Sequence, residues 1–130
     1  MKQAVIFQPD DGVYMLLSGL MKRLGICEKR ISGKELTKTV AELFGLPLVF
    51  PAKQEEEYNP LQPVPAMIIL AGFSQEELDE FLDARKEAGL RGAGLLAMMT
   101  PDNLGWTAFG LARELQREHE EMRKRLEKKS

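Results

Sequence analysis

The residues best suited to bind a ligand follow an apolar run near residue 98. They are Thr100, Asn103 and Trp106, in the segment MMTPDNLGW. Asn103 offers a paired donor and acceptor, and Trp106 offers a flat apolar wall. We expect these residues to be structural: Thr100 caps a helix, Asn103 bonds to backbone and Trp106 fills the core. The alternative is a small-molecule pocket with Asp10 or Asp11 across it, because ligands of α/β proteins bind beyond the carboxyl ends of strands.

His119 is the only histidine in the chain, and Cys27 is the only cysteine. His119 falls on an apolar stripe of the expected C-terminal helix, so it is either a packed core residue or a member of the ligand site. The sequence places neither Cys27 nor any serine near His119, so no nucleophile–histidine pair can be argued. Enzymatic activity stays open, but this absence argues against it.

Metal and cofactor sites lack the residues they need. The first strand is followed by QPDDG rather than a glycine-rich phosphate loop, and its two aspartates would repel phosphate. The third expected helix is strongly acidic, but no histidine or compact loop completes a metal shell. We therefore expect neither a metal nor a cofactor.

Composition narrows the class of protein. The chain has 130 residues, with 18 basic and 20 acidic side chains and a net charge of −2. This balance argues against a protein built to bind nucleic acid, apart from a weak contact through the basic C-terminal tail. A single cysteine and the lack of a bilayer-spanning apolar run favour a cytoplasmic location away from membranes.

Two stretches of the chain match in their helix-capping residues. At a spacing of 64 residues, Asp10 aligns with Ser74, both helix N-caps, and Gly25 aligns with Gly89, both placed just after a helix. The spacing then becomes 68, which aligns Ser32 with Thr100 and Thr39 with Thr107. We interpret the match as an internal duplication of architecture.

Each half is predicted to run strand, helix, strand, helix. The expected strands are 4–7, 26–31, 66–71 and 95–99, and the expected helices are 11–24, 34–44, 75–88 and 101–128. We expect an α/β fold in which a duplicated βαβα unit forms a four-stranded sheet in the order 2-1-3-4. Strands are parallel within each half, helices cover both faces, and the C-terminal helix is long. The single domain 1–130 then has halves 1–46 and 66–130, joined by a Pro/Glu-rich linker at 47–65.

The last helix is too long for the sheet. A helix over 101–128 spans about 42 Å, whereas a six-residue strand spans about 20 Å. Met122 and Leu126 on the overhanging part therefore contact another subunit or lie exposed. We expect a non-catalytic interaction or regulatory module that forms a homodimer through this helix or through the edge of the fourth strand, or that binds another protein. The alternative is a small-molecule-binding protein or enzyme that uses the pocket near Trp106.

Three sequence elements resemble a known family. They are the strand followed by GFSQEEL, the T-P-x-N-x-x-W element at 100–106, and the EH pair at 118–119. Together they are similar to a small bacterial family called domain of unknown function 3783, most clearly over 66–120. The resemblance implies no activity, but it marks Asn103, Trp106 and His119 as the first positions to test. Relatives often carry a lysine where this chain has Leu96, which argues against a charged site centred there.

Overall fold

The computed structural model describes residues 1–47 and 59–128. Four strands form one sheet in the order β2-β1-β3-β4. Their bounds are β1 (Gln3–Phe7), β2 (Cys27–Ile31), β3 (Met67–Ala71) and β4 (Leu95–Met98). β1 pairs with β2 and β3 pairs with β4 in parallel, whereas β1 and β3 are antiparallel. The predicted strand order and the parallel pairing within each half are confirmed.

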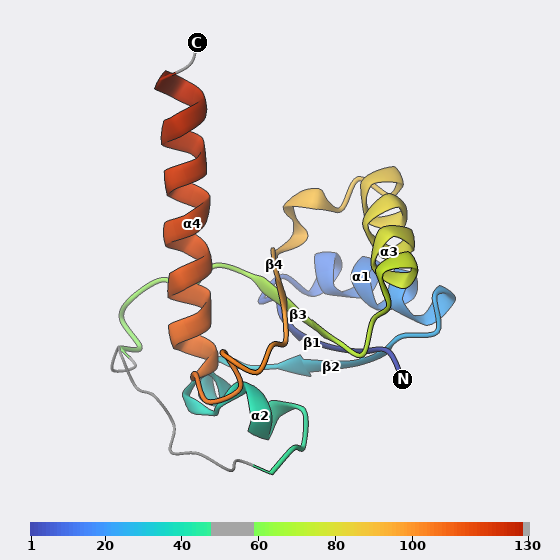
Figure 1. Ribbon diagram of the computed structural model, residues 1–130, viewed down its shortest axis with the longest axis horizontal. Helices are drawn as coiled ribbons and strands as arrows, with labels where there is room; N and C mark the ends of the chain where they lie inside the picture. Colours follow the sequence, from blue (N-terminus) through green and yellow to red (C-terminus); the bar gives the residue numbers. More distant parts are fainter. Residues whose placement is uncertain (48–58, 129–130) are drawn as a thin grey trace.

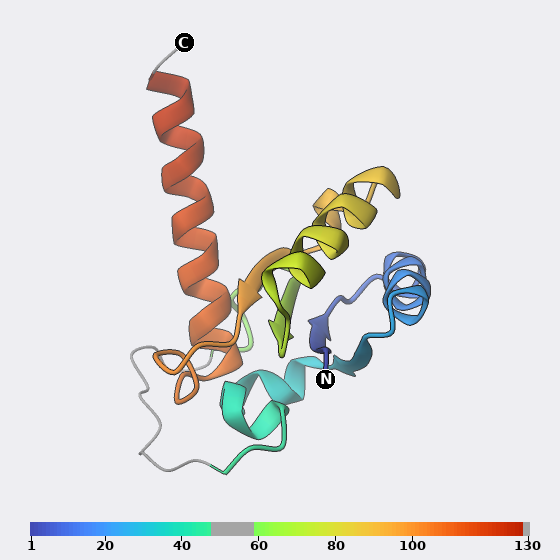
Figure 2. The same cartoon turned by 45° about the vertical axis from the view of Figure 1, so that its right-hand side comes forward.

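Helices cover both faces of the sheet, as predicted (Figure 1, Figure 2). The helices α1 (Asp11–Arg23) and α3 (Gln75–Glu87) pack on one face, where they bury Ile6 and Ile68. The other face buries Val5 and Ile69 under α2 (Val40–Leu43) and α4 (Ala108–Lys128). Successive residues of a strand point to opposite faces, so the apolar residues of β1 and β3 supply both cores.

The predicted helix caps form. Asp10 Oδ1 accepts a hydrogen bond from Val13 N at 2.9 Å, and Ser74 and Glu77 bond reciprocally in a capping box. Gly25 and Gly89 follow α1 and α3 with φ of 70° and 71°, a left-handed conformation that costs glycine little. Local sequence therefore sets where these two helices begin and end.

The predicted helix over 34–44 is wrong as one element. The chain forms a 3-10 helix, η1 (Gly33–Thr37), then an extended step at Lys38 and Thr39, then the short α2. The step pairs with the segment before α4: Ala108 N donates to Lys38 O, and Val40 N donates to Trp106 O, both at 2.9 Å. Tertiary backbone pairing therefore replaces the helix bonds expected from local sequence.

The last helix begins later than predicted, at Ala108 rather than at residue 101. Thr107 is its cap, because Thr107 Oγ1 accepts a hydrogen bond from Gly110 N at 3.0 Å. The 21 residues of α4 still span about 32 Å, against about 17 Å for a five-residue strand. Its side chains are exposed from Arg117 to Glu127, and Figure 1 shows α4 standing clear of the sheet. The predicted overhang is confirmed.

Two further expectations concern the rest of the chain. Most of the predicted linker at 47–65 lies outside the described residues. None of the helices within 1–47 and 59–128 is long and apolar enough to cross a membrane.

Candidate functional site

A turn built by Thr100 and Asn103 follows the carboxyl end of β4. Thr100 N donates to Asn103 Oδ1 at 2.9 Å, and Asn103 N donates to Thr100 Oγ1 at 3.3 Å. Asn103 Nδ2 also donates to Met98 O at 2.9 Å, and the residue is 8% exposed. Asn103 therefore bonds to backbone, as the structural interpretation expected. The expectation that Thr100 caps the last helix is wrong, because Thr100 caps this turn and α4 begins at Ala108.

An open groove of about 360 Å³ lies beside this turn. Thr100, Asn103 and Trp106 line it together with Glu114 and Glu118 of α4, so the structure brings the first three residues together as expected. Trp106 is half-buried, with one part against the core. Asp102 is a third acidic residue at the groove. Glu114 is paired with Arg117 at 2.8 Å, and the carboxylates of Asp102 and Glu118 favour a cationic or neutral ligand over an anionic one.

Asp10 is not part of this groove. β1 runs antiparallel to β3, and β3 runs parallel to β4, so the carboxyl end of β1 lies at the opposite end of the sheet from Thr100. Gln8 Nε2 accordingly donates to Ala93 O at 2.6 Å, just before β4 begins. The expectation that Asp10 or Asp11 faces Trp106 is wrong, because the two halves of the sheet run antiparallel to each other.

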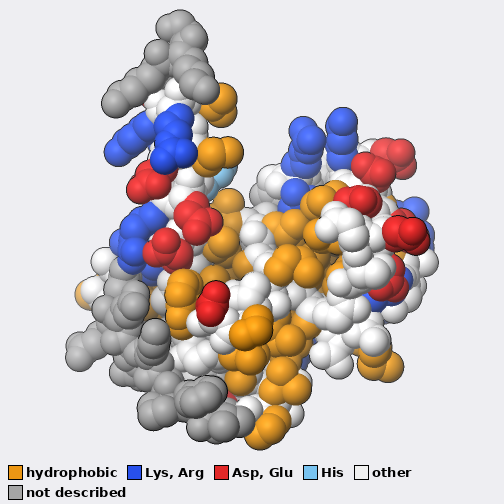
Figure 3. All heavy atoms as spheres, in the orientation of Figure 1, with side chains coloured by type: hydrophobic (Ala, Val, Ile, Leu, Met, Phe, Trp, Pro, Cys, Tyr) orange, Lys and Arg blue, Asp and Glu red, His pale blue; other side chains and the backbone are white. Residues whose placement is uncertain are grey.

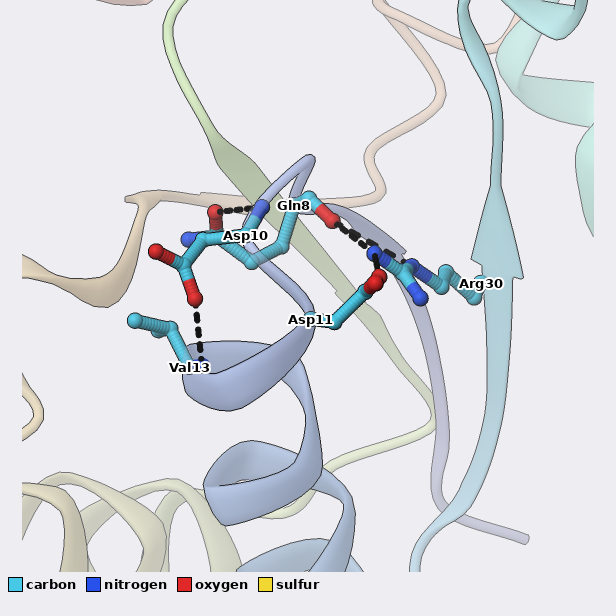
Figure 4. A network of polar contacts seen from close by, with 5 residues as sticks. All are labelled: Gln8, Asp10, Asp11, Val13 and Arg30. Atoms are coloured by element: carbon cyan, nitrogen blue, oxygen red, sulfur yellow. Dashed lines mark hydrogen bonds and ion pairs between the residues drawn. The ribbon is translucent and has the colours of Figure 1, made fainter.

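Asp10 and Asp11 are engaged in a network at the start of α1 (Figure 4). Asp10 caps the helix through Val13 N, and Asp10 N donates to Gln8 Oε1 at 3.0 Å. Arg30 of β2 donates from Nη2 to Asp11 Oδ1 at 2.8 Å and to Gln8 O at 2.7 Å. The two aspartates therefore hold the turn between β1 and α1 against the edge strand.

Sequence reasoning missed the continuation of this network along α1. The Arg30 guanidinium lies 4.4 Å from the centre of the Tyr14 ring, and Tyr14 Oη donates to Glu28 Oε2 at 2.6 Å. Burial and the contact with Glu28 raise the pKa of Tyr14. The available signal was the alternation of Glu28 and Arg30 on β2, which puts both side chains on one face of the strand. The contacts join α1 to β2.

His119 lies apart from both of these regions. It is exposed and lines an open groove of about 430 Å³ between α4 and the segment leading into β4. Arg123 lines the same groove from α4, and Arg91 lines it from the 3-10 helix η2 (Arg91–Ala93). The interpretation of His119 as a packed core residue is wrong, because α4 has already left the sheet at this point. Within the described residues, no group of three or more histidine, cysteine, aspartate or glutamate side chains is arranged to hold a metal ion.

The chain carries a mixed α/β fold whose second half matches a known family. Residues 66–122 match the family model described as Domain of unknown function (DUF3783). The matched part contains Thr100, Asn103, Trp106 and His119, but not Asp10. No curated protein and no solved structure matches the chain.

Proposed function

We propose that the protein is a non-catalytic interaction module of the bacterial cytoplasm that forms a homodimer through the overhanging part of α4. The observation that carries this proposal is the exposure of two large apolar side chains there: Met122 is 60% exposed and Leu126 is 68% exposed. Apolar side chains aligned on an unsupported helix lose contact with water when a partner covers them, which favours association.

These side chains belong to a regular seam, here called the overhang stripe. Its members are Leu115, His119, Met122 and Leu126, which follow one another at spacings of four, three and four residues. That alternation is the spacing with which two helices pack side by side. Leu115 still contacts the core, whereas the other three members are exposed. A helix end of this length is marginal on its own in water, so a second helix would also stabilise it.

Light scattering between about 1 and 100 µM tests the proposal, because a short helix pair belongs to the weak interfaces. We expect the intact chain to approach the mass of a dimer as its concentration rises. The same chain without residues 121–130 is expected to remain a monomer, with circular dichroism as the check that it is folded. An intact chain that stays monomeric throughout contradicts the proposal. A dimer that persists after the deletion of residues 121–130 would indicate that the interface lies at the edge of β4 and not on α4.

A second candidate function is small-molecule binding in the groove beside Trp106. It is favoured by the meeting of Thr100, Asn103 and Trp106 around one groove, and the acidic lining points to cationic amines as ligands. Trp106 is the only tryptophan, so intrinsic fluorescence reports on this groove directly. A ligand of this site should change the fluorescence and raise the melting temperature of the wild type but not that of Trp106→Ala. Equal thermal shifts in the wild type and in Trp106→Ala would exclude this groove as the binding site.

A further inference from the structure

We propose that the two copies of α4 pair antiparallel, with Leu115 of one copy against Leu126 of the other and His119 against Met122. This inference rests on the proposed self-association and adds its direction and register. In this arrangement the overlap runs from residue 115 to residue 126, about 17 Å of helix.

The direction follows from where the overhang stripe leads. The same spacing continues toward the start of α4 through Ala112 and Ala108, and both are 0% exposed beneath the sheet. In a parallel pair, the second helix would follow the stripe back to Ala108 and occupy the space that the sheet already fills. In an antiparallel pair the second helix ends near Leu115, and its own sheet lies beyond the free end of the first. Steric exclusion therefore leaves the antiparallel direction.

The molecule has room for the incoming helix end on the required side. The groove of about 430 Å³ separates His119 and Arg123 from Arg91 and Gly92. Figure 3 shows this hollow between the upper part of α4 and the body that carries α3, with the pale blue histidine and hydrophobic side chains on the side of α4 facing it. The C-terminal end of a second α4 would enter this hollow, and its apolar side chains would meet the stripe.

Charges beside the stripe agree with the same register. When Leu115 lies opposite Leu126, Glu118 of each copy lies opposite Arg125 of the other, which gives two equivalent pairs of opposite charge. A parallel pair would instead place Glu118 opposite Arg123.

His119 then has a positioning role within the seam. In the antiparallel register it packs against Met122, and most slips along the seam would place the imidazole against leucine or leave it uncovered. A single polar residue in such a seam fixes the register and weakens the association. We expect His119→Leu to tighten the dimer by about tenfold or more, because each copy replaces a polar contact with an apolar one.

Disulfide trapping measures the direction. In a Cys27→Ser background, Leu115→Cys and Leu126→Cys chains are oxidised separately and then as a mixture. We expect covalent dimers chiefly in the mixture, formed between the two different chains. Rapid cross-linking of Leu126→Cys with itself is the result for a parallel pair and would overturn the inference.

Reversal of the charges beside the overhang stripe is a second test of direction, which does not depend on a cysteine that could weaken the dimer. Glu118→Arg should raise the dissociation constant, and adding Arg125→Glu should restore it. Rescue by Arg123→Glu instead would indicate a parallel pair. An outcome that indicates a parallel pair overturns only the direction of pairing. The proposed function itself fails if the wild-type chain shows no dimer in sedimentation equilibrium. A looser dimer in His119→Leu would also overturn the role given to this residue.

Discussion

Thr39 and Thr107 face each other in an isolated antiparallel β-bridge, and each also caps the helix that follows it. Thr39 Oγ1 accepts a hydrogen bond from Glu42 N at 3.1 Å, and Thr107 Oγ1 accepts one from Gly110 N at 3.0 Å. Both threonines are buried. The bridge therefore fixes the base of α4 to the first half of the chain, and it sets the direction in which the overhang stands.

Removal of one of these caps is expected to destabilise the whole fold. Thr107→Val keeps the shape of the buried side chain but loses the acceptor for Gly110 N, which should lower the free energy of unfolding by about 1 kcal/mol. Urea denaturation measures the change. Thr37→Val is the control, because Thr37 is exposed and donates only to Lys34 O at 3.3 Å. Equal losses in both variants would contradict the role of Thr107 as the cap of α4.

Two glycine-to-alanine substitutions are expected to act in opposite directions. Gly89 adopts a φ of 71°, so Gly89→Ala should lower the free energy of unfolding by about 1 kcal/mol through backbone strain. Gly19 lies within α1 with nothing near the position of an added Cβ, so Gly19→Ala should raise it by about 0.5–1 kcal/mol. Urea midpoints compare the two variants. A stabilised Gly89→Ala protein would refute the left-handed helix end.

The capping box of α3 should be visible in the titration of Glu77. Hydrogen bonds from the Ser74 backbone, and then from its side chain, lower the pKa of Glu77 from its ordinary value. A lowered pKa means that this contribution to stability is present above the ordinary pKa of a glutamate and is lost as the pH falls through the lowered value. NMR titration of the Glu77 carboxylate should show the shift, and Ser74→Ala should move the pKa back upward. Ser74→Ala keeps the backbone N–H that donates to Glu77 Oε1, so an unchanged pKa in this variant would rule out only the contribution of the Ser74 side chain.

The sheet was predictable from the sequence because its signals are local and agree with one another. β3 is apolar throughout, and it is followed by a capping box and a glycine-ended helix. β2 carries three consecutive charged residues, Glu28, Lys29 and Arg30, which are typical of an edge strand, and it lies at an edge of the sheet. The internal duplication stays a prediction. The residue opposite Val5 in the register between β1 and β3 is Ile69, and these two are aligned at the spacing of 64 residues, as Thr39 and Thr107 are at 68.

The sequence-based expectations were wrong where hydrogen bonds between segments far apart in the chain determine the structure. The break at Lys38 and the late start of α4 depend on hydrogen bonds between two segments far apart in the sequence, which no local pattern reveals. The separation of Asp10 from Trp106 follows from the antiparallel pairing of β1 with β3, which no local pattern in the sequence reveals. The apolar stripe of α4 suggests burial for His119, but the helical periodicity continues past the point where the sheet ends, and His119 is exposed. Periodicity identifies the face of a helix but not where its support stops.

Sedimentation equilibrium with one matched pair of variants tests the central claim most directly. Met122→Glu and Met15→Glu place the same charge on methionines that are 60% and 72% exposed, but Met15 lies on α1, away from the overhang stripe. We predict a concentration-dependent dimer for the wild type and for Met15→Glu, and a monomer for Met122→Glu over the same range. A Met122→Glu chain that associates as strongly as the wild type would contradict the claim that the α4 overhang is the interaction surface.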